Sequence, residues 1–274
     1  MISAADIANA LRWEWFRLSR RAGLWVILGL VAVAVAGVVV VTVVVQNAVA
    51  SGFSIPSNGF PLLVFEVLSR LGPFLGIILA AIVFGGDFGW GTLRPLLARG
   101  QARWQIALVK LILPGVILGI VWLVAWTLAA AVGLAAGEPS AGALEFLADS
   151  PDDWPGTVGR FFSAWPVAIT YLGLAALLCA LGRSTAFGVG VAVAIVLVEA
   201  VAYPIAGIIA ELALDFSLDE YTRWTLRGVT DGLMGRDDDF GPWVFLPATA
   251  AYLALFWGLT LAVIARRDVS SGNG

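Results

Sequence analysis

The stretch LWVILGLVAVAVAGVVVVTVVV, residues 24–45, carries no charged side chain. A helix that crosses the hydrocarbon core of a bilayer needs about 20 mostly apolar residues, so the stretch predicts a membrane-spanning helix. RRAG before it and AVASG after it resemble the flanks of a cleavable signal peptide. However, a signal peptide has an apolar core of only about 7–15 residues. We therefore expect the stretch to be retained as a span.

The composition of the whole chain supports a membrane protein. Of its 274 residues, 60% are hydrophobic and 13% are charged, whereas soluble domains carry about 25% charged residues. Histidine, the commonest general base and metal ligand, is absent, and the single cysteine, Cys179, has no internal disulfide partner. The sequence also contains no G-x-x-x-x-G-K-[ST] phosphate loop. We therefore expect no enzyme activity and no cofactor or metal bound by this chain. The net charge of −3 predicts no nucleic-acid partner.

Five further apolar stretches bring the number of predicted spans to six. They are residues 62–86, 106–136, 161–181, 185–209 and 244–265. With the N-terminus in the cytoplasm, most of the 16 basic residues fall on the inner side, as the positive-inside rule requires. The inner residues are Arg12, Arg17, Arg20, Arg21, Arg94, Arg99, Arg103, Lys110, Arg183, Arg266 and Arg267. We predict an all-α polytopic membrane protein, residues 1–274 forming one transmembrane domain with both termini cytoplasmic.

The segments outside the spans suggest further elements. Residues 4–21 combine apolar residues at helical spacing with four arginines, which is typical of an amphipathic helix lying on the membrane. After the fifth span, Pro204 is expected to interrupt the helix, so residues 202–216 predict a broken or re-entrant outer segment, with a simple loop as the alternative. The acidic residues 211–240 are interpreted as a solvated loop, with a funnel for cations as the alternative.

Besides Lys110 near the start of the third span, three charged residues lie inside predicted spans. Glu66 and Arg70 occupy the first turns of the second span, and Glu199 lies within the fifth. An ionisable residue inside a span is often functional, so all three are candidates for a transport pathway. For Glu199, an interfacial or packing carboxylate is the alternative. The glycines in the runs GLAALLCALG and FGVGVAVAI are expected to permit close helix packing.

The stretch GGDFGWGTLRPLLARGQARWQIALVK, residues 85–110, interrupts the apolar pattern between the second and third spans. Residues 92–103 predict a short amphipathic helix, with Thr92 as the N-cap. Leu93, Leu96 and Leu97 form an apolar ridge, and Arg99 and Arg103 follow four residues apart. The pattern fits equally a connector lying on the membrane and a docking element for a cytoplasmic partner. Lys110, the only lysine, is interpreted as a headgroup anchor.

This stretch resembles the signature of type-2 ABC transporter permeases, the membrane subunits of ATP-binding-cassette exporters. In that signature an acidic residue and an aromatic residue precede Gly-Thr, a leucine-rich turn, two arginines and a lysine. The matching residues are Asp87, Phe88, Gly91, Thr92, Leu93, Leu96, Leu97, Arg99, Arg103 and Lys110. The six spans, the N-terminal helix and the expected break before the last span add to the resemblance.

The resemblance implies a permease subunit of an ABC transporter, with residues 92–103 as the coupling helix. Asp87, Thr92, Leu93, Leu96, Leu97, Arg99 and Arg103 would then dock on a separate cytoplasmic ATPase, present in two copies. ATP and Mg would bind to that partner, and a second permease copy or a paralogue would complete the pathway. The second and fifth spans usually line it, which brings in Glu66, Arg70 and Glu199.

The resemblance also implies export of a small molecule or lipid across the inner or cell membrane of a bacterium or archaeon. The substrate itself is not predicted. A secondary transporter or channel, and a non-transporting membrane scaffold, are the alternative functions.

Overall fold

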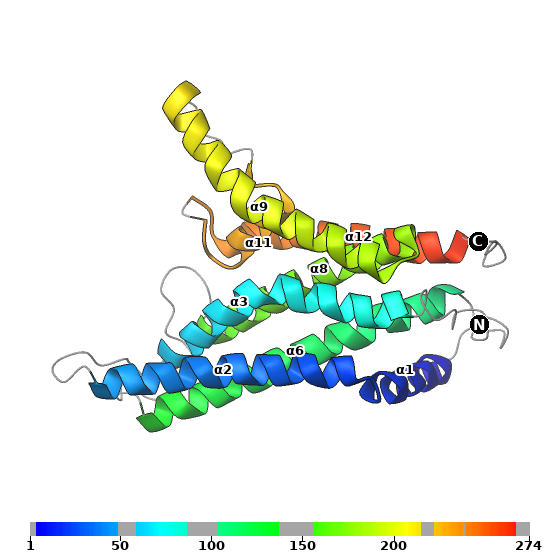
Figure 1. The fold of residues 1–274 in the computed structure, drawn as a ribbon, viewed down its shortest axis with the longest axis horizontal. Helices are drawn as coiled ribbons and strands as arrows, with labels where there is room; N and C mark the ends of the chain where they lie inside the picture. Colours follow the sequence, from blue (N-terminus) through cyan, green and yellow to red (C-terminus); the bar gives the residue numbers. More distant parts are fainter. Residues whose placement is uncertain are drawn as a thin grey trace.

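The computed structural model describes residues 4–48, 59–86, 103–136, 156–214, 222–237 and 239–266. Within these ranges the chain is all helical, and six helices are long and apolar enough to cross a membrane (Figure 1). They are α2 (Ala22–Ala48), α3 (Gly59–Ala80), α6 (Arg103–Ala136), α8 (Gly156–Gly182), α9 (Thr185–Leu214) and α12 (Leu246–Arg266). A π-helical turn, η1 (Ala81–Gly85), continues α3. Each long helix overlaps one predicted span, so the prediction of six spans is confirmed at the level of length and composition.

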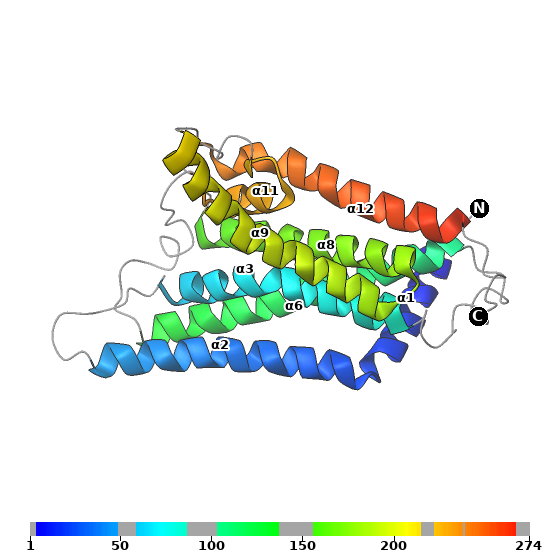
Figure 2. The same cartoon turned by 45° about the horizontal axis from the view of Figure 1, so that its top comes forward.

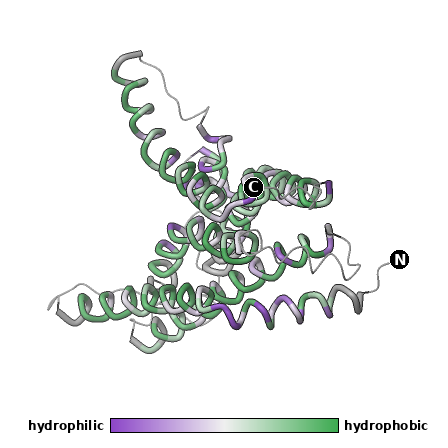
Figure 3. The backbone as a smooth tube through the Cα atoms, turned by 45° about the vertical axis from the view of Figure 1, so that its right-hand side comes forward, coloured by the Kyte–Doolittle hydropathy of each residue, from purple (hydrophilic) through white to green (hydrophobic). Residues whose placement is uncertain are grey.

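Helix α8 lies at the centre of the bundle, where it packs against α3, α6, α9 and α12. The side chains of α3, α6 and α8 form most of the buried core, whereas α2, α9 and α12 expose most of their surface. Figure 3 shows that the exposed helices are apolar around their circumference. A helix that is apolar on all sides must be covered by lipid or by another protein chain. The outer three helices therefore require such a cover.

Two glycines allow the central helices to approach closely. A Cβ atom at Gly76 of α3 would overlap the backbone carbonyl oxygen of Ala168 on α8. A Cβ atom at Gly188 of α9 would overlap the Sγ atom and the backbone nitrogen of Cys179, also on α8. Small residues at helix crossings let backbones pack directly. The prediction of close packing at the glycine-bearing runs is thus confirmed for α8 and α9.

The bundle has two ends that differ in the elements they carry (Figure 2). The "α1 end" carries α1 (Ala4–Ser19), the turn between α8 and α9, and the end of α12. The "α11 end" carries α11 (Leu226–Leu233) and the 3-10 turn η2 (Pro242–Phe245). The helix predicted at residues 4–21 is confirmed over Ala4–Ser19. Its position on a membrane, and the cytoplasmic location of the α1 end, stay predictions.

The structure corrects the prediction that Pro204 interrupts the fifth span. Helix α9 continues through Pro204 to Leu214 without a break. A proline removes one backbone hydrogen bond. In an apolar environment, however, every other backbone group finds its partner only inside the helix, so the helix persists. Residues 215–221 lie outside the described residues.

Most of the predicted coupling helix also lies outside the described residues. Residues 87–102, which include Asp87, Thr92, Leu93, Leu96, Leu97 and Arg99, are not described, and Arg103 is the first residue of α6. Their predicted roles stay predictions. The interpretation of Lys110 as a headgroup anchor is wrong, because its side chain is 2% exposed and its ammonium group lies 3.1 Å from a carboxylate oxygen of Glu14 on α1.

Candidate functional site

The candidate site is a polar cluster at the α11 end, and α11 provides its framework. The side chain of Thr225 caps this helix by accepting a hydrogen bond from the Gly228 N–H at 3.2 Å. Leu226, Val229 and Leu233 recur at helical spacing and are buried. Their apolar face holds α11 beside α12 and against α8 (Figure 2). The opposite face of α11 therefore presents charged side chains to the ends of other helices.

The end of α11 is held close to η2 by the small size of Gly232. A Cβ atom there would overlap the aromatic ring of Phe245, which is fully buried. Gly235 follows with a positive φ of 74°, a conformation that glycine adopts at little cost. This reversal brings Arg236 back toward α3.

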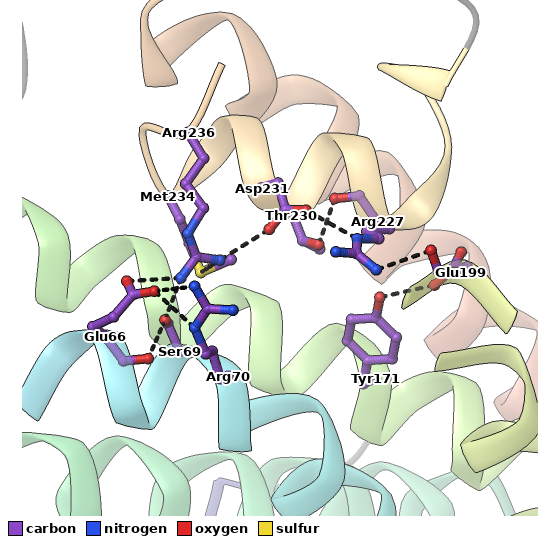
Figure 4. Close-up of polar contacts among 10 residues, drawn as sticks. All are labelled: Glu66, Ser69, Arg70, Tyr171, Glu199, Arg227, Thr230, Asp231, Met234 and Arg236. Carbon is purple, nitrogen blue, oxygen red and sulfur yellow. Dashed lines mark hydrogen bonds and ion pairs between the residues drawn. The ribbon is translucent and has the colours of Figure 1, made fainter. Parts of the chain in front are cut away.

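Arg236 connects α11 to α3 through three hydrogen bonds (Figure 4). Its Nη2 atom donates to Glu66 Oε2 at 2.9 Å and to Ser69 Oγ at 2.8 Å, both on α3. Its Nη1 atom donates to Asp231 Oδ1 on α11 at 2.9 Å. Glu66 also accepts from Arg70, whose Nη2 lies 2.6 Å from Oε1. One carboxylate on α3 is thus shared by two guanidinium groups from different elements.

Arg227 connects the same helix to α9. Its Nε atom donates to Asp231 Oδ2 at 3.2 Å, and its Nη1 atom donates to the backbone carbonyl of Glu199 at 2.9 Å. The side chain of Glu199 turns toward α8, where the Tyr171 hydroxyl donates to Oε2 at 3.2 Å (Figure 4). Both Tyr171 and Glu199 are buried. The contacts therefore run without interruption from α3 through α11 to α9 and α8.

Charges alternate along this polar cluster, which we define as Glu66, Ser69, Arg70, Tyr171, Glu199, Arg227, Asp231 and Arg236. The cluster contains three arginines and three carboxylates. Glu66 and Asp231 accept hydrogen bonds from arginines, and the Glu199 carboxylate accepts one from Tyr171. Burial of Arg236 opposes its charge, but the hydrogen bonds and ion pairs with Glu66 and Asp231 outweigh burial and raise the pKa of Arg236 above its ordinary value. Arg236 is therefore a permanent cation between two anions.

A pocket of about 620 Å³ lies beside the cluster, between the second half of α9 and α11. Tyr203, Pro204 and Ile208 line it from α9, and Arg227, Asp231 and Arg236 line it from the cluster. On its far side Arg223 donates to Asp237 Oδ2 at 2.8 Å and also to Asp239. The hydrogen bond that Arg223 donates to Asp239 is the largest influence on the pKa of Arg223, which is raised. The pocket therefore has one apolar wall and one wall of paired charges.

The structure brings the three predicted pathway residues into one cluster. Glu66 and Arg70 are paired on α3, and Glu199 is joined to them through Arg227, Asp231 and Arg236. Sequence reasoning did not predict that Arg227, Asp231 and Arg236 belong to the site, because residues 211–240 were interpreted as a solvated loop. That interpretation is wrong for Leu226–Leu233, which form α11. The spacing of Leu226, Val229 and Leu233 within the acidic stretch was the signal that indicated a helix.

The described residues contain no group of three or more His, Cys, Asp or Glu side chains that could hold a metal ion. The cluster itself joins α3, α11, α9 and α8 through ion pairs and hydrogen bonds, and these can break and re-form.

Comparison with known proteins points to a transporter family. A family model described as "ABC-2 family transporter protein" matches residues 52–268, which is well over half of the chain. The matched range includes the whole polar cluster. The search of curated proteins found no match.

Proposed function

The chain belongs to the ABC-2 transporter family, and we propose that it is the permease subunit that forms the transmembrane pathway and couples to a separate cytoplasmic ATPase. The family match over residues 52–268 is the observation that carries this proposal. Membership in this family favours the permease subunit of an ABC transporter over the two alternative functions, a secondary transporter or channel and a non-transporting scaffold. The direction we propose is export, and the cargo is a small molecule or lipid.

The proposed division of labour assigns ATP and Mg to the partner subunit, since the sequence contains no phosphate loop. Residues 92–103 would dock on the ATPase. In that contact Leu93, Leu96 and Leu97 supply the apolar surface and Arg99 and Arg103 pair with acidic groups. Asp87 and Thr92 would set the start of the docking helix. This assignment rests on the sequence pattern and on the position of residues 87–102 between α3 and α6.

A second permease copy, or a paralogue, would complete the pathway. The second half of α9 diverges from the bundle (Figure 1) and carries a stripe of exposed apolar side chains at helical spacing. The stripe consists of Leu197, Val201, Ile205, Ile208 and Leu212. The last of these is 84% exposed, which is unfavourable unless lipid or protein covers it. We propose that the second permease faces α9 and that α3 and α9 line the pathway between the two chains.

On this arrangement the polar cluster lies at the α11 end of the proposed pathway. Glu66, Arg70 and Glu199 would then meet the cargo, and the ion pairs of Glu66 would close that end when no cargo passes. The pocket beside the cluster opens between the same elements, α9 and α11. The ion pairs that Glu66 and Asp231 form with Arg236 and Arg227 can separate and re-form when α11 moves.

The ATPase contact is tested by purifying the chain with its cognate ATPase from a co-expression. We expect Arg99→Glu combined with Arg103→Glu, and separately Leu96→Asp, to abolish co-purification and the ATP hydrolysis of the complex. Arg223→Glu is the matched control, because it reverses a charge at the opposite end of the bundle. Retained co-purification and unchanged hydrolysis in both docking variants would contradict the proposed coupling helix.

A further inference from the structure

Residues 87–102 lie between α3 with η1 and α6 in the sequence, and two contacts tie the N-terminal part of the chain to the helices on either side. One comes from α1 and the other from the corner between α1 and α2. The first contact involves Lys110 on α6, whose ammonium group lies 3.1 Å from Glu14 Oε1. Lys110 is 2% exposed, and the side chain of Glu14 is largely buried as well. Arg17 also pairs with Glu14, with Nη2 2.6 Å from the same oxygen. Removing one partner of a buried ion pair leaves an unpaired buried charge and strongly destabilises the folded protein. This contact therefore holds α1 against α6.

The second contact involves Arg21, which occupies the corner between α1 and α2. Its Nη1 atom donates to the backbone carbonyl of Ile82, inside the π-helical turn η1. A Cβ atom at Gly86 would lie only 2.9 Å from the same Nη1 atom, so the guanidinium group rests against the last described residue of this helix. Short π-helical turns inside α-helices are frequent at functional positions. Here the turn places a carbonyl within reach of Arg21.

The corner itself is rigid, because Leu18 and Leu24 on either side of it are each 1% exposed. The Leu18 carbonyl accepts a hydrogen bond from the Arg21 N–H, and the Arg21 carbonyl accepts one from the Leu24 N–H. Motion of α1 is therefore passed directly to α2. The two side-chain contacts lie at residues 82–86 and at residue 110, on either side of residues 87–102.

From this arrangement we infer that Glu14 and Arg21 are positioning residues for coupling. They tie η1 and α6, the two described elements on either side of residues 87–102, to the α1–α2 corner and to α1, so that a displacement of η1 and α6 carries α2 with it. The inference rests on the proposed function, because the displacement would come from the ATPase. The inference adds α2, most of which is exposed, to the helices that move when the ATPase acts on the permease.

The clamp is tested first in the isolated full chain by a distance measurement between spin labels. The labels are placed at Trp13→Cys on α1 and Trp104→Cys on α6, both exposed positions, and the natural Cys179 is buried. We expect a narrow distance distribution in the otherwise unchanged chain. Glu14→Gln should broaden it at least twofold, and Glu14→Lys combined with Lys110→Glu should restore it. The matched control is Asp239→Asn, at the α11 end. An equally narrow distribution in Glu14→Gln overturns the clamp.

The transmission to α2 is tested in the complex with the ATPase. Labels at Val33→Cys on α2 and Leu255→Cys on α12 report their separation with and without a non-hydrolysable ATP analogue. We expect a nucleotide-dependent shift that is lost in Glu14→Gln combined with Arg21→Gln, while binding of the ATPase is retained. A shift that survives in that variant, or no shift in the unchanged complex, overturns the inference and leaves the proposed function standing. Failure of the unchanged chain to bind the ATPase overturns both.

If Glu14→Gln fails to fold, Glu14→Gln combined with Lys110→Met removes both charges and leaves no unpaired buried ion. The same two distance measurements then apply to that variant, with the same expected losses. Preserved distances in the doubly neutral variant contradict a role for the ion pair in positioning.

Discussion

Arg236 and Glu66 are 170 positions apart in the sequence, and their side chains meet at 2.9 Å between Nη2 and Oε2. This pair joins the segment that follows α11 to the first part of α3. Ser69 lies directly beneath it, is 2% exposed, and accepts a second hydrogen bond from the same nitrogen atom at 2.8 Å. The pair therefore covers a buried polar side chain at the α11 end, and the exposure of Ser69 reports whether the pair is intact.

We predict that a Ser69→Cys variant is protected from a membrane-impermeant maleimide in the resting protein. Arg236→Met should raise the labelling rate about tenfold, which corresponds to a loss of about 1.4 kcal/mol in closing free energy. Arg223→Met removes the ion pairs with Asp237 and Asp239 but does not touch α3, so it should leave the rate unchanged. The labelling rates are measured by mass spectrometry. Equal rates in the Arg236→Met and Arg223→Met variants would show that Arg236 does not hold this end closed.

Tyr171 and Glu199 allow stability to be separated from transport. Tyr171→Phe leaves the buried carboxylate without its hydroxyl donor and should destabilise the protein by about 1–3 kcal/mol. Glu199→Gln keeps an acceptor for Tyr171 without a buried charge and should unfold no earlier than the unchanged chain. Thermal unfolding in detergent measures both effects. If Glu199 meets the cargo, Glu199→Gln should lose transport despite normal stability, whereas full transport would assign it to packing alone.

Gly76 and Gly29 should respond in opposite directions to the same substitution. Gly76→Ala places a Cβ atom against the backbone of Ala168 and should destabilise the protein by about 1–3 kcal/mol. Gly29→Ala on α2 meets no atom within 4 Å, so the better helix propensity of alanine should be neutral or stabilising by up to about 1 kcal/mol. Midpoints of thermal unfolding compare the two. A stable Gly76→Ala variant would mean that α3 and α8 lie farther apart than described.

Cys179 should be chemically inert in the folded protein. It is fully buried in α8, where Gly188 of α9 packs directly on its sulfur. We expect no labelling by maleimide in detergent-solubilised protein and complete labelling after denaturation. Intact-mass measurement before and after denaturant provides the test, and rapid labelling of the native chain would indicate that α8 and α9 separate.

Much of the fold was predictable because the signal is local. The apolar stretch 24–45 has no charged side chain, and none of the other five predicted spans has more than two. Hydrophobic length alone therefore indicates six helices. The helix at Ala4–Ser19 was likewise predicted from its own residues. Pro204 was misjudged because its effect depends on the environment: a proline that would end a helix in water is tolerated where the backbone has no other partner.

The candidate site was predictable only in part. The charges of Glu66, Arg70 and Glu199 within apolar stretches marked them as unusual, and that much is written in the sequence. The residues that pair with them could not be predicted, because Arg236, for example, lies in an acidic segment that resembles a solvated loop. The same limit applies to Lys110, which a pattern of flanking apolar residues places at a membrane surface but which in fact pairs with Glu14.

The sequence by itself determined that this chain needs an apolar environment, that it has six long apolar segments, and which residues are charged in unexpected places. Only the tertiary structure decided which charges meet. The ion pair between Glu14 on α1 and Lys110 on α6 joins residues 96 positions apart in the sequence. The pair between Glu66 on α3 and Arg236 after α11 joins residues 170 positions apart. Such pairs depend on how whole helices pack, and no local pattern of residues encodes that packing.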